Sequence, residues 1–270
     1  MVRYFPLDII IVQGETYYTD RRVFLVVKKI GTDASSDTHL VIDNKPVGDY
    51  IATVAPLHVT SSNKLGPANL GNYYLVIPPE TMFYVEGASG AKMRLVGTLG
   101  KLDVGEAMPA DILARFGNQH NAYVTHLSGS VSLGTDVALA ADAETEVFSL
   151  TPKTIEKYIL AYPVLADVDN YTPSEGDLAY RFYIDNDPLD ALTAEPGTIR
   201  GGVDLLAMPR PPADSTEEIG FSFADMPVEI LGDHTFSVRV RNTKGSSISP
   251  TSGTSLVFYF DTLGVYIRTG

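Results

Sequence analysis

The chain has 270 residues, of which 44% are hydrophobic and 20% charged, and its 20 Lys and Arg against 33 Asp and Glu give a formal net charge of −13. These values exclude a disordered chain, and the negative charge argues against direct binding to the phosphate backbone of a nucleic acid. The chain contains no cysteine, so neither disulfide bonds nor thiolate metal ligands can stabilise the fold.

Residue usage favours β-structure. The 15 Tyr and 11 Phe suit pleated, half-buried surfaces, whereas 23 Gly and 17 Pro interrupt the chain too often for long helices. We therefore expect an all-β protein of the jelly-roll barrel or sandwich type, with two barrels. No apolar stretch approaches the roughly 18–20 residues of a membrane-spanning helix. The apolar run within residues 1–14 is also too short and broken for a signal peptide.

Alternating apolar and polar residues predict the first strands at 7–12 and 23–30, separated by a turn-rich segment. Shorter extended pieces follow at 39–43 and 50–54. Residues 61–71 are polar and contain Gly and Pro, which indicates a long loop.

The middle of the chain shows a more regular pattern. Three strands are predicted, and the glycines of the turn at 87–90 can supply the positive φ angles of a tight hairpin. We therefore expect a meander of strands at 73–77, 82–86 and 92–99. A short helix is predicted at 108–116, with Pro109 in its first turn and Gly117 after its end. Residues 120–143 are small and polar, and the Ala-rich stretch within them fits either a helix or a linker.

A second series of strands is predicted at 146–150, 157–162, 178–184, 235–241, 255–261 and 265–268. The two series predict a first barrel at 1–143 and a second at 144–270. A faint internal echo fits this division, because in each half a proline, Pro79 or Pro227, precedes a strand, a Gly-containing turn and a strand that bears Arg. Two such halves fit two jelly rolls of eight strands each.

Nucleophile and metal patterns have simpler interpretations. The sequence Gly87-Ala88-Ser89-Gly90-Ala91 lacks the last glycine of a nucleophile elbow and suits a turn between strands. His120 and His126 would share one face of a strand, but residues 117–121 indicate a loop, so we expect neither to bind a metal. The other histidines are scattered, at His39, His58 and His234.

The acidic stretch from Asp167 to Asp190 offers the oxygen ligands that calcium prefers. The ligand order of an EF-hand fails, however, because Tyr171 and Leu178 occupy two of its ligand positions. We expect solvated acidic loops here. The glycines at 97–100 have neither a Rossmann nor a P-loop spacing. The sequence therefore predicts no catalytic residue, no metal ligand, no cofactor and no enzyme activity.

One stretch resembles a known family. Residues 73–87 read YYLVIPPETMFYVEG, and with the acidic, cysteine-free chain of short strands and long Gly, Pro and Ser connections they resemble jelly-roll capsid proteins of icosahedral viruses. Length and composition are similar to the larger major capsid protein of tailless, membrane-containing icosahedral phages of Thermus. The resemblance covers the whole chain and assigns no role to a single residue.

The resemblance implies a structural subunit of the virion. Its expected partners are other capsid subunits and a second, smaller coat protein, near an internal viral membrane that the chain does not cross. Neither direct nucleic-acid binding nor a small-molecule substrate is expected. An alternative is a carbohydrate- or receptor-binding β-sandwich of a phage fibre or adhesin, whose sugar-stacking residues would be Tyr17, Tyr18, Tyr73, Tyr74 or Tyr171. A third is a sandwich-type hydrolase, whose acid pair the sequence does not locate.

Overall fold

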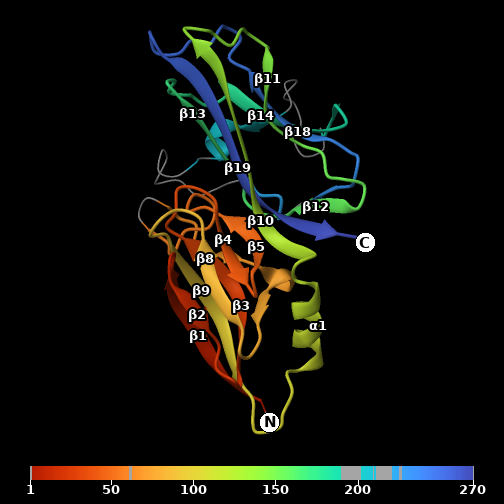
Figure 1. Cartoon of the computed structure of the whole chain (residues 1–270). Helices are drawn as coiled ribbons and strands as arrows, with labels where there is room; N and C mark the ends of the chain where they lie inside the picture. Colours follow the sequence, from red (N-terminus) through yellow and green to blue (C-terminus); the bar gives the residue numbers. More distant parts are fainter. Residues whose placement is uncertain are drawn as a thin grey trace. The chain divides into compact units, whose positions relative to one another are not determined.

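A computed structural model describes residues 2–60, 63–189, 202–208, 210, 221–224 and 227–269 (Figure 1). Contacts divide the chain into two compact units. Unit 1 comprises residues 1–126 and 265–269, and unit 2 comprises 127–264 with residue 270. In the described residues, regular structure is antiparallel β-sheet apart from one α-helix and two short 3₁₀ turns, η1 (Gly71–Tyr73) and η2 (Leu205–Ala207).

Unit 1 contains two antiparallel sheets. The first has the order β1-β9-β3, and both β6 and β7 pair with the far side of β3. Its strands are β1 (Arg3–Val12), β3 (Val23–Thr32), β6 (Ala68–Asn69), β7 (Leu75–Ile77) and β9 (Lys92–Lys101). The second has the order β2-β8-β4-β5, with strands β2 (Thr16–Tyr18), β4 (Thr38–Ile42), β5 (Lys45–Tyr50) and β8 (Met82–Glu86).

The pairing in unit 1 is nested from its first strand to its last. β1 pairs with β9, β2 with β8, β3 with β7, and β4 with β5. This is the pairing of one long antiparallel hairpin wrapped so that successive pairs lie alternately in two sheets, which defines a jelly roll. Side chains alternate between the two faces of each strand, and the inward ones, such as Leu7, Ile11, Leu40 and Val85, are buried.

Unit 2 repeats the nested pairing. β10 neighbours β19, and β11 pairs with β18, β12 with β17, and β14 with β15. One sheet holds β10 (Ala122–Thr135), β12 (Glu156–Leu160), β13 (Leu165–Asp169), β17 (Val228–Ile230) and β19 (Ser255–Arg268). The other holds β11 (Glu144–Leu150), β14 (Leu178–Ile184), β15 (Asp187–Pro188), β16 (Val203–Asp204) and β18 (Phe236–Asn242). The expected all-β, two-jelly-roll fold is confirmed.

The core of unit 2 is aromatic. The fully buried phenylalanines are Phe182, Phe223, Phe236, Phe258 and Phe260. The rings of Phe182 and Phe236 stack with an interplanar angle of 10° across neighbouring strands, and Phe223 meets Phe182 edge-on at 5.1 Å. Such pairs add to the stabilisation that burial already gives.

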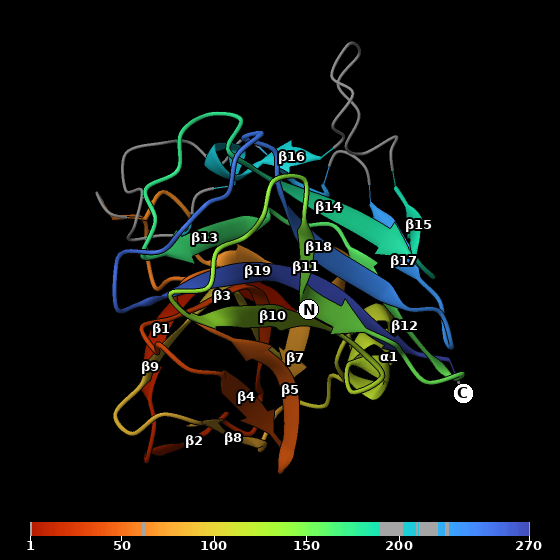
Figure 2. The ribbon, with the colours of Figure 1, turned by 90° about the horizontal axis from the view of Figure 1, so that it is seen from above.

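The helix α1 (Ala110–Asn118) begins two residues later than predicted, with Pro109 at its N-cap. Its Ile112 joins a small buried cluster with Phe24, Val26 and Val76 of β3 and β7, and with Leu102. The helix therefore covers the outward face of this part of the first sheet, as Figure 2 shows beside β7.

The meander predicted over 73–99 does not form. β7, β8 and β9 follow one another in the chain, but β8 lies in the second sheet while β7 and β9 lie in the first. The turn at 87–90 therefore crosses between sheets, with positive φ at Gly87 and Gly90. Alternating hydrophobicity shows which face of a strand is buried but not which strand lies beside it, so a meander and a jelly roll share one pattern.

The strand β10 at 122–135 was not predicted from the small and polar segment 120–143, whereas the Ala-rich stretch after β10 is a connection with turns and an isolated bridge at Leu139. The small residues of β10 allow a close approach to β11. A Cβ on Gly129 would lie 2.4 Å from the carbonyl oxygen of Val147, next to the bulge between Glu146 and Phe148. A glycine is used here because it lets two backbones approach closely, and its low β-propensity therefore does not mark the end of a strand.

The internal echo compared strands that are not equivalent. By their place in the nested pairing, β8 corresponds to β18 and β9 to β19, whereas the echo set β8 against β17 and β9 against β18. Contacts assign 127–143 to unit 2. That 1–143 and 144–270 are separate barrels stays a prediction.

Candidate functional site

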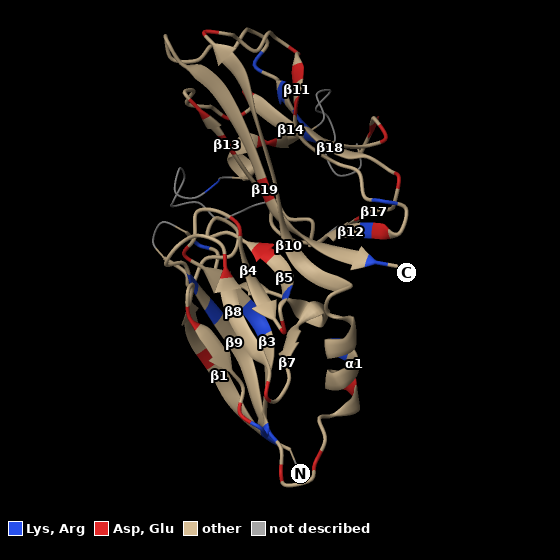
Figure 3. Ribbon diagram, in the orientation of Figure 1, with Lys and Arg blue, Asp and Glu red and all other residues tan. Residues whose placement is uncertain are grey.

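Charge is divided unequally between the two units. Unit 1 carries 12 Lys and Arg and 12 Asp and Glu, whereas unit 2 carries 8 and 21. The formal charge of −13 therefore belongs to unit 2, and unit 1 is neutral. Figure 3 shows the charged residues of each unit. Counting charges in each half of the sequence would have revealed this asymmetry.

Three of the five histidines face carboxylates. His39 lies between Asp49 and Glu86, with N–O distances of 3.3 and 3.1 Å. His126 lies 2.7 Å from Asp37. His234 lies 2.5 Å from Asp185, whose pKa is lowered by the His234 hydrogen bond and by the amide of Thr235. His39 joins strands β4, β5 and β8, His126 joins β10 to the loop before β4, and His234 joins two turns.

The remaining histidines, His58 and His120, differ in burial. His58 is exposed, whereas His120 is half-buried and its Nδ1 has no hydrogen-bond partner among the described residues. Burial, and then the charge of Lys45, lower the pKa of His120. Within the described part of the chain, no group of three or more His, Asp or Glu side chains has a metal-binding arrangement. That neither His120 nor His126 binds a metal stays a prediction.

The acidic stretch is dispersed over β13, β14 and their connections. Asp177 is buried and bonded by the amide of Ser174 at 2.9 Å and by the hydroxyl of Tyr171. Asp169 accepts a hydrogen bond of 2.6 Å from Tyr259. Glu175 and Asp187 are exposed, and Asp190 lies outside the described residues. Asp177 and Asp169 thus accept hydrogen bonds from other groups of the protein, and they do so in different places.

The turn from Gly87 to Ala91 leads out of β8 and into β9, and Ser89 is exposed on it. The amide of Gly90 donates a 3.1 Å hydrogen bond to Gln13 Oε1, which joins this turn to the one after β1. These contacts are those of a turn that joins two strands.

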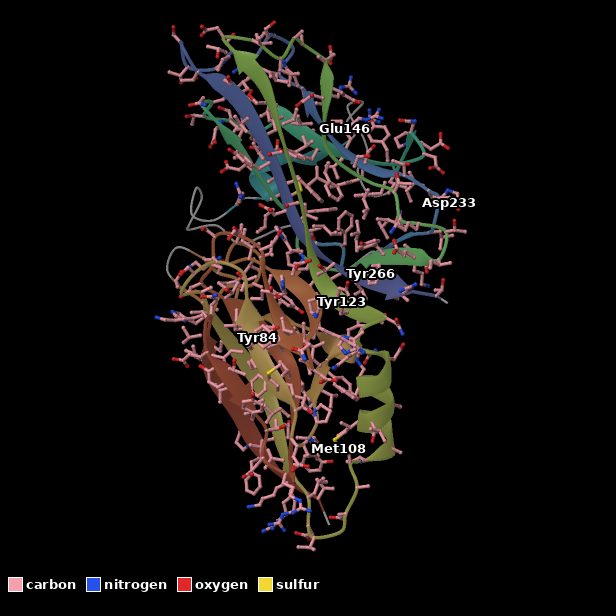
Figure 4. All side chains as sticks on the ribbon, in the orientation of Figure 1. Tyr84, Met108, Tyr123, Glu146, Asp233 and Tyr266 are labelled. Atoms are coloured by element: carbon pink, nitrogen blue, oxygen red, sulfur yellow. The ribbon has the colours of Figure 1, made fainter. Side chains whose placement is uncertain are left out.

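Most of the tyrosines considered for sugar stacking have partners within the protein. The Tyr17 ring stacks on Phe83 with centroids 5.7 Å apart, Arg115 lies over Tyr74, and Lys244 lies over Tyr171. Tyr18, by contrast, is 69% exposed on β2. Figure 4 shows a further pair, Tyr123 of β10 and Tyr266 of β19, whose ring centroids are 5.0 Å apart. Tyr17, Tyr74 and Tyr171 thus have a ring or a cation of the protein against them.

The edges of the first sheet in unit 1 were not foreseen from the sequence. Gln119 is fully buried, and its amide bonds both backbone groups of Val76, with Val76 N at 2.7 Å and Val76 O at 3.0 Å. Arg115 donates to the carbonyls of Tyr73, Tyr74 and Ala122 at 2.7–3.0 Å. Gln119 thus takes the place of a neighbouring strand at Val76 of β7, and Arg115 holds the residues just before β7. No sequence pattern signals this role.

No helix in the described residues is long and apolar enough to cross a bilayer. No protein-family model matches the chain, and no curated protein matches it in sequence.

The comparison with solved structures gives distant likenesses to viral proteins. The chain is similar to the major capsid protein of bacteriophage PM2, with a TM-score of 0.31 and 12% identity, covering 100% of both chains. It is similar to a turret protein of Sulfolobus turreted icosahedral virus, with a TM-score of 0.21, 8% identity and coverage of 97% and 99%. It is also similar to VP54 of PBCV-1, fitted into a reconstruction of the virophage Sputnik, with a TM-score of 0.32, 11% identity and coverage of 100% and 95%. At these TM-scores, the strand pairing described above is what identifies the two jelly rolls.

Proposed function

We propose that this chain is a structural subunit of an icosahedral virus capsid and resides in the virion. The observation that carries the proposal is the nested strand pairing, found twice in one chain. Jelly rolls occur in viral capsids, lectins and cupins. A shell subunit needs broad outer surfaces and a rigid core, and two jelly rolls in tandem supply both.

The arrangement of side chains supports a structural role over a sugar-binding one. A glycan platform needs aromatic faces open to solvent, whereas Tyr17, Tyr74 and Tyr171 are engaged by Phe83, Arg115 and Lys244. We therefore rank the hypothesis of a fibre or adhesin module second. We also propose that the chain is not an enzyme.

The finer features of the proposal follow from the resemblance and from charge. We propose that the chain is the larger of two coat proteins, as in the Thermus phages, with a smaller partner and a membrane beneath the shell. Direct contact with nucleic acid is not part of the proposal. Copies with a charge of −13 repel one another at short range, so assembly needs apolar contacts, cations or a partner of complementary charge.

Light scattering and electron microscopy of the purified chain test the proposal. We expect a monomer or small oligomer at neutral pH and low salt. Larger assemblies should form with added salt, with calcium, with a candidate second coat protein, or as the pH falls toward the sequence pI of about 4.7. A chain that stays small under all these conditions and binds a glycan array in the same buffers would support the adhesin alternative instead.

A further inference from the structure

The two edges of the first sheet in unit 1 have different neighbours. At β7, Gln119 bonds the outward backbone groups of Val76, and Arg115 bonds the carbonyl of Tyr74 just before the strand. At β1, β9 lies on one side, and no strand of the described residues lies on the other. Figures 1 and 2 both place β1 and β2 on the side of unit 1 away from α1.

The open edge is apolar. Four large hydrophobic side chains on β1 and β2 are exposed: Tyr4 at 53%, Phe5 at 45%, Ile10 at 53% and Tyr18 at 69%. The described residues contain ten exposed large hydrophobics in all, so β1 and β2 hold a large share of them. Tyr4 and Ile10 lie on one face of β1, Phe5 lies on the other, and Tyr18 is on the edge strand of the second sheet. Exposed apolar side chains on edge strands are a feature of interaction surfaces.

The same edge is electrically neutral. The charged residues of β1 are Arg3 and Asp8, and β2 has none. Asp8 forms a bidentate pair with Arg94 at 2.8 and 2.7 Å, and Arg3 pairs with Asp103 at 3.3 Å. A highly charged partner would therefore find no unpaired charge on these strands, whereas an apolar and neutral surface fits them.

The backbone of β1 limits how a partner binds. The amide of Val12 bonds the hydroxyl of Tyr17 at 3.2 Å, so it points away from β9. Because backbone groups alternate sides along a strand, the outward positions include Tyr4, Pro6 and Ile10. Pro6 has no N–H, which interrupts the row of donors. A partner therefore contacts this edge mainly through side chains, and a continuous added strand is disfavoured.

We propose that the β1–β2 edge of unit 1 is the surface through which this chain contacts a second copy of itself. The inference rests on the proposed role as an assembling subunit. A second copy offers the matching chemistry, since its own unit 1 is neutral and carries the same apolar edge. Contact between two copies of unit 2 would bring together surfaces with 21 acidic and 8 basic residues each.

The test compares two double variants by sedimentation equilibrium, over a range of concentrations and in salt that screens unit 2. Ile10→Ser with Tyr18→Ser removes apolar surface from the edge. The control, Leu113→Ser with Val104→Ser, removes it from α1 and the loop before it, where these side chains are 53% and 87% exposed. We expect the edge variant to weaken self-association about tenfold or more and the control to leave it unchanged.

A second measurement covers the case in which the edge variant does not fold. Because the chain has no cysteine, a single Ile10→Cys or Leu113→Cys can carry an environment-sensitive fluorophore. Emission should shift to the blue with rising concentration for the label at position 10 and not at 113.

The outcomes separate this inference from the proposed function. A wild-type chain that is monomeric throughout, or equal effects of edge and control variants, would overturn the inference. So would a shift at position 10 that appears only when a different coat protein is added. Particles that form normally from the edge variant would contradict the inference and leave the capsid role standing. Small oligomers lost in the edge variant, from a chain that never forms particles, would do the reverse.

Discussion

The rings of Tyr4 and Phe24 meet edge to face, with centroids 6.2 Å apart, across the strand that separates them. Both residues are paired with Gly100 of β9, Tyr4 from β1 and Phe24 from β3. A Cβ at position 100 would lie 2.1 Å from the Phe24 ring. The glycine therefore gives the aromatic pair its space, and the pair covers the glycine.

We predict that Gly100→Ala lowers the free energy of unfolding by about 1–3 kcal/mol, because the added methyl forces the Phe24 ring to move. Gly117→Ala is the matched control. Nothing lies within 4 Å of a Cβ at position 117, which is in α1, so this variant should be neutral or slightly stabilising. Chemical denaturation of the two variants measures the difference, and equal stabilities would contradict the packing argument.

The bond pair between Gln119 and Val76 gives a second prediction. Gln119→Leu leaves the buried amide and carbonyl of Val76 without these partners, and each unsatisfied group costs about 1–3 kcal/mol. Gln119→Glu keeps an acceptor for the amide, but its ionised carboxylate has no donor for the carbonyl, so it should be less stable than the wild type at neutral pH. At a pH where the carboxyl is protonated, its O–H can donate to the carbonyl and the loss of stability should shrink. Hydrogen exchange at Val76 should quicken in the Leu variant. An unchanged exchange rate would show that β7 needs no edge partner.

The sequence predicted individual strands better than their partners. The strands 82–86 and 178–184 have the predicted bounds, because alternation follows directly from which face is buried. Which strands pair depends on contacts between residues far apart in the chain, such as His39 with Glu86 or Gln119 with Val76. Local sequence patterns carry no information about these contacts. A buried Gln at the end of a helix looks like any surface residue in sequence.

Acid should weaken the fold partly through Asp177. Burial raises the pKa of this carboxyl, but hydrogen bonds from Tyr171 and Ser174 and the charge of Lys244 outweigh it, so the pKa lies below its usual value. A lowered folded-state pKa gives stability that is full above the unfolded-state pKa of about 3.9 and is lost as the pH falls through the folded-state pKa.

We therefore predict that Asp177→Asn is less stable than the wild type at pH 7 and that the difference shrinks toward pH 2. Thermal unfolding across this range measures it, and Asp187→Asn, at an exposed carboxylate on β15, serves as the control. A stability difference that is constant with pH would mean that Asp177 acts through its shape and not its charge.

The uneven charge of the two units makes a last prediction about assembly. Repulsion between copies acts over a Debye length of about 8 Å at physiological salt, so the acidic residues that matter are those on unit 2. Glu175→Gln with Asp187→Asn removes two exposed charges from unit 2, and Glu80→Gln with Asp111→Asn removes two from neutral unit 1. Both double variants change the total charge by the same amount, because each removes two carboxylates. We expect the unit 2 pair to assemble at lower salt than the wild type, because it reduces the local excess of acid, and the unit 1 pair to shift the required salt less. Light scattering against salt concentration gives the midpoint of assembly for each variant.

If the two double variants shift this midpoint equally, the net charge of the chain governs assembly and the position of the charge does not. If neither does, apolar contacts such as those of the β1–β2 edge set the threshold alone.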